Sequence, residues 1–188
     1  LDCGIKAIDK VVYANERGID FIICDHHLPG AELPDAVAVL DPKRKDCPYP
    51  YKELSGCGIG FKLAQGIAQR NGIALNELEP LLDLVAVSTA CDIVPVTGEN
   101  RVLTHFGLKR VNQATRPGFK VMMRMANVKR VLGVSDLVFS IGPRINAAGR
   151  IEHGRQAVEL LLAKSDAQAE QIGLRVDGNN TARQELDK

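Results

Sequence analysis

The stretch Phe21-Ile22-Ile23-Cys24-Asp25-His26-His27 decides the fold of this sequence of 188 residues. The residues before Asp25 are mostly apolar from Ile19 onwards, which predicts a strand over residues 19–24 that is buried on both faces, as in a parallel sheet. Open α/β sheets bind their ligands beyond the carboxyl ends of their strands. Since Asp25, His26 and His27 can all bind metal, the sequence predicts a metal site at this edge.

The residues that precede this strand predict a βαβ unit whose first strand is cut away. Apolar residues at 5, 8, 11 and 12 have the spacing of an amphipathic helix over 5–15, and Gly18 returns the chain to the next strand. Parallel strands joined by a right-handed crossover can lie side by side, about 4.8 Å apart. Asp2 is therefore expected on the same rim as Asp25 and His26, in a site that fits metal ions about 3.5–4 Å apart.

A third candidate ligand is Asp92. Residues 80–90 predict a helix that is buried on most sides, and the chain then continues Cys91-Asp92. A carboxylate that closes so apolar a helix is costly unless a cation or a hydrogen-bond donor meets it. The alternative is a solvated acid in the turn before Pro95, and Asp83, within the helix, is a weaker candidate.

Five segments resemble, in order, the motifs of the RecJ branch of the DHH phosphoesterases. They cover residues 1–5, 25–27, 55–63, 83–95 and 142–150. Asp25-His26-His27 is shared by the whole superfamily. The run Gly142-Pro143-Arg144-Ile145-Asn146-Ala147-Ala148-Gly149-Arg150 is much more specific to RecJ-like exonucleases.

The resemblance implies a fold, an activity and partners. The fold is α/β, a parallel sheet flanked by helices with a helical second half, and the activity is a cytoplasmic 5′→3′ exonuclease on single-stranded DNA that uses Mn²⁺ or Mg²⁺ in DNA repair and recombination. A helicase and a single-strand-binding protein are the implied protein partners. The family's first Asp-x-Asp motif would precede Leu1, and its DHH-associated domain would follow Lys188. We therefore expect residues 1–163 to form an N-terminally truncated catalytic domain, weak or inactive alone, and residues 164–188 to begin a connecting helix.

The charge is distributed unevenly along the sequence. The net charge is +1, but residues 101–155 contain eleven Lys or Arg and two acids, which is +9 and leaves −8 elsewhere. A domain with one basic wall and another rich in carboxylates suits a polyphosphate substrate held near cations. The alternative is a solvated helical surface whose charges face in many directions.

Residues 142–150 are predicted to form a DNA-binding loop within this basic segment. Arg144 and Arg150 carry planar guanidinium groups that bind phosphate in two-point geometry, and Asn146 can donate to phosphate or sugar. Gly142 and Gly149 would let the backbone approach a ligand closely.

A second glycine-rich segment, residues 55–60, is predicted to open a helix over 61–70. Its glycines either expose N–H groups to an anion or, as we favour, allow close packing of the helix on a strand.

The cysteine content and the hydropathy exclude several classes of protein. Five cysteines without a Cys-x-x-Cys pair argue against a disulfide framework and a zinc site, and they favour reduced thiols. Cys24 and Cys91 lie beside proposed ligands, but soft ligation by them is disfavoured. No apolar run is long enough to predict a membrane span.

The mechanism that these residues favour is two-metal hydrolysis of a phosphodiester. Asp2, Asp25, His26 and Asp92 are the predicted ligands, and His27 is a further ligand or a contact to the scissile phosphate. Two rival functions remain open. One is a DHH phosphoesterase for short oligonucleotides or nucleotide bisphosphates, and the other is a RecJ-like nucleic-acid-binding module without catalysis.

Overall fold

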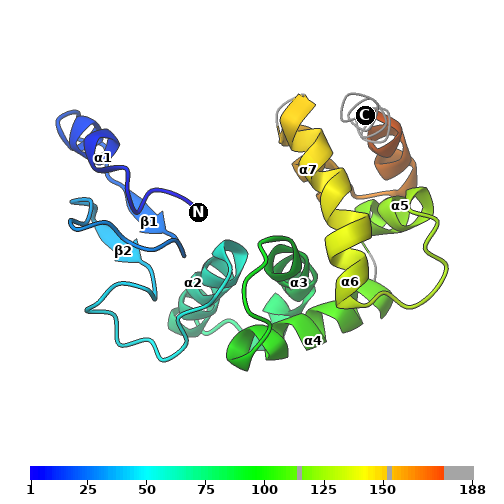
Figure 1. Cartoon of the computed structure of the whole chain (residues 1–188), viewed down its shortest axis with the longest axis horizontal. Helices are drawn as coiled ribbons and strands as arrows, with labels where there is room; N and C mark the ends of the chain where they lie inside the picture. Colours follow the sequence, from blue (N-terminus) through cyan, green and yellow to red (C-terminus); the bar gives the residue numbers. More distant parts are fainter. Residues whose placement is uncertain (114–115, 152–153, 176–188) are drawn as a thin grey trace. The chain divides into compact units, whose positions relative to one another are not determined.

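The computed structural model describes residues 1–113, 116–151 and 154–175, and the chain divides into two compact units, Leu1–Phe106 and Gly107–Lys188. The first unit holds a small parallel sheet with helices, and the second contains helices joined by turns, with no strand among its described residues (Figure 1). The predicted α/β class is therefore confirmed. The predicted boundary at residue 163 stays a prediction. Residues 166–175 are helical, as expected for the start of a connecting helix, and 176–188 lie outside the described residues.

The sheet pairs β1 (Ile22–Cys24) with β2 (Ala38–Leu40) in parallel, with Ile23 opposite Val39. The predicted parallel pairing type is correct, but β1 is shorter than the strand expected over residues 19–24. It is also not buried on both faces, because Ile22 is 61% exposed. Neighbouring side chains point to opposite faces of a strand. On one face of β1, Ile23 lies against Gly4. On the opposite face, Cys24 packs in the core around Leu54 and Ile59, whereas Ile22 is left exposed.

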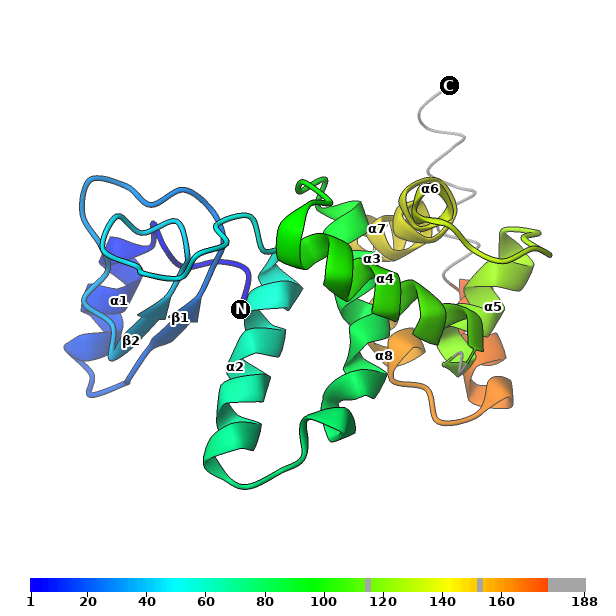
Figure 2. The same ribbon diagram turned by 90° about the horizontal axis from the view of Figure 1, so that it is seen from below.

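Helix α1 (Ile8–Asn15) lies beside the two strands (Figures 1 and 2) and buries Val11 and Ala14. The helix begins at Ile8, whereas the sequence predicted that it would begin at residue 5. The backbone N–H of Ile5 donates instead to the carboxylate of Asp25, 2.9 Å away, and the N–H of Ala7 donates to Gly4. The residues before α1 are thus held by the end of β1 rather than by helical hydrogen bonds.

Helix α2 (Gly56–Arg70) begins where a glycine-rich loop was predicted. The hydroxyl of Ser55 accepts a hydrogen bond from the N–H of Gly58 at 3.2 Å, which caps the helix and makes residues 56–60 its first turn. The same hydroxyl lies 3.2 Å from that of Thr89. This contact joins the start of α2 to α3.

Helix α3 (Leu82–Cys91) follows a 3-10 segment, η1 (Leu75–Leu81), which contains Pro80. Most residues of α3 are buried, as predicted: Asp83, Val85, Ala86, Val87, Thr89 and Ala90. Helix α4 (Gly98–Gln113) comes next and ends in the second unit. The packing of α2 on α3 sets the place where α3 ends, at Asp92.

The second unit contains α5 (Pro117–Met125), α6 (Val134–Asp136), the π-helical turn η2 (Leu137–Ile141), α7 (Gly142–Ile151) and α8 (Arg155–Leu161). Residues 142–150 are therefore helical, and the predicted loop is wrong. Gly142 and Pro143, which ordinarily disfavour helix interiors, come directly after the π-helical turn η2, so α7 continues the helical segment that begins at Val134. Ser165 caps the helical residues that follow it, since its hydroxyl accepts from the N–H of Gln168.

We expect Asp136 to make the stability of the protein depend on acid pH. A hydrogen bond from the N–H of Gly133, and then the Arg130 guanidinium at 2.7 Å, hold the pKa of Asp136 below its ordinary value. The stabilisation is present above the unfolded pKa of about 3.9 and is lost as the pH falls through the folded pKa. Asp136→Asn should flatten the pH dependence of the free energy of unfolding in urea between about pH 2 and 5. Asp166→Asn, at an exposed acid, is the control, and equal slopes in the two variants would contradict the prediction.

Across the described ranges, no helix is both long and apolar enough to cross a membrane.

Candidate metal centre

Asp2 is held at the carboxyl end of β1 by its own backbone. Its N–H donates to the carbonyl of Cys24 at 2.8 Å, so residue 2 runs alongside the strand end, as the predicted shared rim requires. Its φ of 66° is in the left-handed region, which is strained for most residues other than glycine. The Asp2 side chain is 60% exposed and lies against Gly56.

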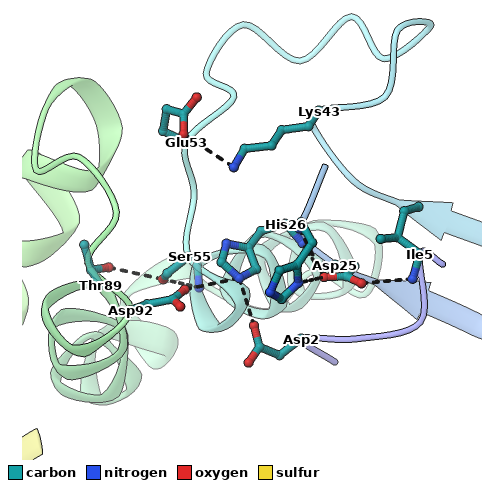
Figure 3. A network of polar contacts seen from close by, with 11 residues as sticks. Asp2, Ile5, Asp25, His26, Lys43, Glu53, Ser55, Thr89 and Asp92 are labelled. Carbon is teal, nitrogen blue, oxygen red and sulfur yellow. Dashed lines mark hydrogen bonds and ion pairs between the residues drawn. The ribbon is translucent and has the colours of Figure 1, made fainter. Parts of the chain in front are cut away.

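His26 is the centre of the site. Its Nε2 lies 3.2 Å from the Oδ1 of Asp2 and 3.2 Å from the Oδ2 of Asp92, and Figure 3 shows the two carboxylates converging on the ring. The ring is buried, whereas Asp2 and Asp92 face partly into solvent. Three of the residues predicted to bind metal are thus brought together.

Asp92 reaches His26 because α3 ends there. Asp92 is the last residue to donate into the helix, to Ser88, and the next residue, Ile93, has a φ of 56°. A β-branched residue in that region is strained, and such strain concentrates at functional sites. Asn100 holds the turn that follows, because its buried amide donates to the carbonyls of Pro95 and Glu53.

Asp25 is buried and its two carboxylate oxygens accept four hydrogen bonds. Oδ2 accepts from the N–H of Ile5, and Oδ1 accepts from the N–H groups of His26 and His27 and lies 2.7 Å from Nδ1 of His27. Burial disfavours the charged form, but the hydrogen bonds from Ile5 and His27 outweigh it and lower the pKa of Asp25. The hydrogen bond to Asp25 in turn raises the pKa of His27. Asp25 therefore orients His27, whose ring is 56% exposed.

This donor set fits a divalent cation. Both ring nitrogens of His26 are buried, and neither has a hydrogen-bond partner among the described residues, although Nε2 faces two acids. The ligand atoms of Asp2, His26 and Asp92 lie within 4.8 Å of one another, and so do those of Asp25, His26 and His27. Carboxylate oxygens with imidazole suit Mn²⁺, and carboxylate oxygens suit Mg²⁺. A cation between the two carboxylates would give Nε2 of the buried imidazole a ligand bond where these residues give it no hydrogen bond.

The cysteines near the site are poorly suited to bind metal. Burial raises the pKa of the Cys24 thiol and of the Cys91 thiol, and it raises the pKa of Cys57 to about 11. A thiol must lose its proton to become a ligand. This agrees with the prediction that Cys24 and Cys91 do not act as soft ligands.

Two buried polar residues close to the site were missed from the sequence. Asp41 follows β2 as Asp25 follows β1, so the rule that drew attention to Asp25 could have found it. Asp41 is buried, and burial raises its pKa, with the charge of Asp25 adding to the effect. Asn100 had no local signal, because its role depends on two carbonyls that are 5 and 47 residues away.

The residues predicted to bind DNA all lie on α7. Arg144 donates from Nη1 to the carbonyl of Ser140 at 2.8 Å and from Nη2 to that of Met125 at 3.0 Å. Asn146 is exposed, and the side chain of Arg150 lies outside the described residues. Of the two remaining histidines, His105 is exposed on α4, and His153 is not among the described residues.

We expect Arg144→Ala to lower the free energy of unfolding by about 1–3 kcal/mol, because two carbonyls would lose a charged donor. Asn146→Ala, two residues further along the same helix at an exposed position, should change it by less than about 0.5 kcal/mol. Thermal and urea unfolding of both variants make the comparison. If Arg144→Ala kept full stability and only weakened DNA binding, the hydrogen bonds to Ser140 and Met125 would not stabilise the fold, and the role of Arg144 would lie in DNA binding.

Comparison with known proteins defines the class of this fold and site. Residues 1–89 match the DHH family, N-terminal domain.

The particular relatives are RecJ proteins, and the resemblance seen in the motifs is confirmed over the whole chain. The chain is 40% identical over 188 residues to the single-stranded-DNA-specific exonuclease RecJ of Bacillus subtilis (strain 168), covering 99% of this chain and 23% of the relative. It also matches a crystal structure of exonuclease RecJ bound to manganese, with a TM-score of 0.86 and 30% identity over 99% of this chain and 46% of that one. A structure of RecJ from Thermus thermophilus in complex with Mg²⁺ matches with a TM-score of 0.67 and 30% identity, over 74% of this chain and 22% of that one.

Proposed function

We propose that the protein hydrolyses phosphodiester bonds of single-stranded DNA in a reaction that uses Mn²⁺ or Mg²⁺. One observation carries the proposal: the carboxylates of Asp2 and Asp92 converge on Nε2 of a buried histidine that has no hydrogen-bond partner among the described residues. The names of the RecJ relatives support the substrate and the exonuclease activity, and the structures that match hold Mn²⁺ or Mg²⁺. Because the chain spans about a quarter of the curated relative, the activity of the whole protein is inferred.

The metal-binding residues in this proposal are Asp2, His26 and Asp92, with Asp25 and His27 beside them. A bound pair of cations would activate water and neutralise the charge that develops on the phosphate oxygens. His26 belongs to both groups of candidate ligands, so its imidazole would be a ligand at the centre of the site. The exposed ring of His27, held by Asp25, is placed to bind a cation or to donate to the scissile phosphate, and the raised pKa of His27 favours donation.

Asp25 holds this arrangement together rather than facing the substrate. Three of its hydrogen bonds tie the backbone N–H groups of residues 5, 26 and 27 to one carboxylate, and the fourth joins it to Nδ1 of His27. Hydrogen-bonded carboxylates behind a ligand imidazole fix its ring orientation and raise its basicity. We therefore propose that Asp25 is a positioning residue, and that direct ligation is the role of the other members of the site.

The second unit supplies the proposed DNA-binding residues Arg144, Asn146 and Arg150. The charge of +9 over residues 101–155 supports this role, and so does the exposure of Asn146. Since Arg144 already donates to two carbonyls, its contribution to binding would come from its charge and its remaining donors. From the RecJ resemblance we further propose 5′→3′ polarity, a cytoplasmic role in DNA repair and recombination, and a helicase and a single-strand-binding protein as partners.

The test is degradation of a 5′-labelled single strand and of its 3′-labelled twin by the full-length protein with Mn²⁺. We expect release of the 5′ label first and no reaction in excess chelator. Release of the 3′ label first would overturn the polarity, and cleavage of dinucleotides alone would favour the short-oligonucleotide phosphoesterase. Metal-independent binding without cleavage would favour the non-catalytic module.

A further inference from the structure

Lys43 is a cation at the edge of the metal centre that the proposed ligand set does not explain. The N–H of Asp25 donates to the carbonyl of Leu40 at 3.0 Å, so the ends of β1 and β2 lie side by side. Beyond the end of β2, the N–H of Lys43 donates to Oδ1 of the buried Asp41 at 2.8 Å. An aspartate that accepts the N–H two residues further on forms a tight turn. This turn holds the backbone of Lys43 beside the metal centre.

The side chain of Lys43 extends from this turn to the segment that leads into α2. Its Nζ lies 3.5 Å from Oε2 of Glu53, and 23% of the side chain is exposed. Glu53 comes two residues before the cap of α2, and the first residue of α2 lies against Asp2. In Figure 3 the side chains of Lys43 and Asp2 are seen on opposite sides of His26. Lys43 thus joins the end of β2 to the start of α2, and both elements border the metal centre.

The contact with Glu53 leaves the ammonium of Lys43 incompletely bonded. A hydrogen bond from an ammonium to a carboxylate is about 2.7–2.9 Å long, and the distance between Lys43 and Glu53 exceeds this. An ammonium has three donors, and within the described ranges Nζ has no other partner. Since an ammonium has no acceptor, it cannot bind a cation. A further partner of Lys43 at a cation site must therefore be an anion.

We propose that Lys43 binds a phosphate oxygen of the DNA strand at the metal centre, an inference that rests on the proposed function. Lysine carries a point charge on a flexible stem and is a common ligand of phosphate. A cation that is already in place where negative charge develops on a transferring phosphoryl group stabilises the transition state. Glu53 holds the ammonium before the strand binds, and the phosphate then replaces this carboxylate as its partner. Asp41 is the positioning residue behind Lys43.

The test is a double-mutant cycle of Lys43→Gln and Glu53→Gln in the full-length protein. If the two residues serve only their ion pair, both single variants and the double variant should lose the same activity, because each lacks the same contact. A phosphate contact predicts instead that Lys43→Gln lowers kcat/KM for a labelled oligothymidylate with Mn²⁺ by about 10–100-fold. Glu53→Gln should keep or raise kcat/KM, and the double variant should resemble Lys43→Gln. The affinity of Lys43→Gln for Mn²⁺ should not fall, because an ammonium is not a metal ligand.

Equilibrium binding of the same strand in excess chelator gives a second measurement. Each phosphate contact with a single strand adds about 0.7 to the slope of log K against log salt, so Lys43→Gln should flatten the slope by about this amount. Lys10→Gln, which removes an exposed lysine of α1, is the control and should match the wild type in rate and slope.

The outcomes separate this inference from the proposed function. Equal rates and slopes in Lys43→Gln and Lys10→Gln, with DNA degraded by the wild type, would overturn the role of Lys43 alone. Equal losses in Lys43→Gln and Glu53→Gln would also overturn it, because the ion pair would then account for both. A wild-type protein that neither binds nor degrades single strands would overturn both proposals.

Discussion

His26→Ala is expected to reduce the Mn²⁺-dependent degradation of single-stranded DNA by more than about 100-fold. Loss of a residue behind a metal ligand commonly costs about 10–100-fold, and His26 is proposed to be a ligand in both sets. The variant would also leave Asp2 and Asp92 facing each other without the imidazole between them. The measurements are initial rates on a labelled strand and a calorimetric titration with Mn²⁺.

His105→Ala is the matched control for this prediction. His105 is exposed on α4, and its ring contact is with Phe106, so its loss should change neither the rate nor the affinity for Mn²⁺. Circular dichroism shows whether both variants fold. A folded His26→Ala protein that binds Mn²⁺ with unchanged affinity would remove His26 from the metal centre.

Gly56→Ala is expected to disable the site although residue 56 has no functional group. A Cβ at this position would overlap Oδ1 of Asp2 and lie 2.9 Å from its Cβ, so Asp2 would have to move away. Asp2 is held by its backbone bond to Cys24 and cannot give way without losing its place beside His26. We expect the affinity for Mn²⁺ and the rate of DNA degradation to fall by about 10–100-fold, as for the loss of a residue that orients a ligand.

Gly66→Ala, in the middle of the same helix, isolates the effect of the contact. A Cβ at residue 66 would meet nothing within 4 Å, so this variant should keep full activity. It should also gain about 0.5–1 kcal/mol in stability, because alanine has the higher helix propensity. Equal activity of the two variants would show that Asp2 can be displaced without harm and would argue against Asp2 as a ligand.

Several errors of the sequence-based prediction have one physical origin. The exposure of Ile22 depends on which elements cover the sheet, and apolar character alone does not report the cover. The segments 55–60 and 142–150 were predicted as loops because of their glycines. In the structure they are helical turns, since Ser55 caps one and the other continues a helical segment from residue 134. In these places neighbouring contacts outweighed local propensity.

The sequence by itself predicted which residues gather at the proposed metal centre. Three local patterns carry this prediction. They are an apolar strand that ends on Asp25-His26-His27, the helix before that strand, and a buried helix that ends on Asp92. The proximity of Asp2 and His26 follows from the geometry of parallel strands, whose carboxyl ends meet at the same edge of a sheet. Only the tertiary structure decided the role of each group. The hydrogen bond from Ile5 to Asp25, the approach of Asp2 and Asp92 to Nε2 of His26, and the Gly56 contact with Asp2 arise between residues that are distant in sequence. Periodicity carries no record of them.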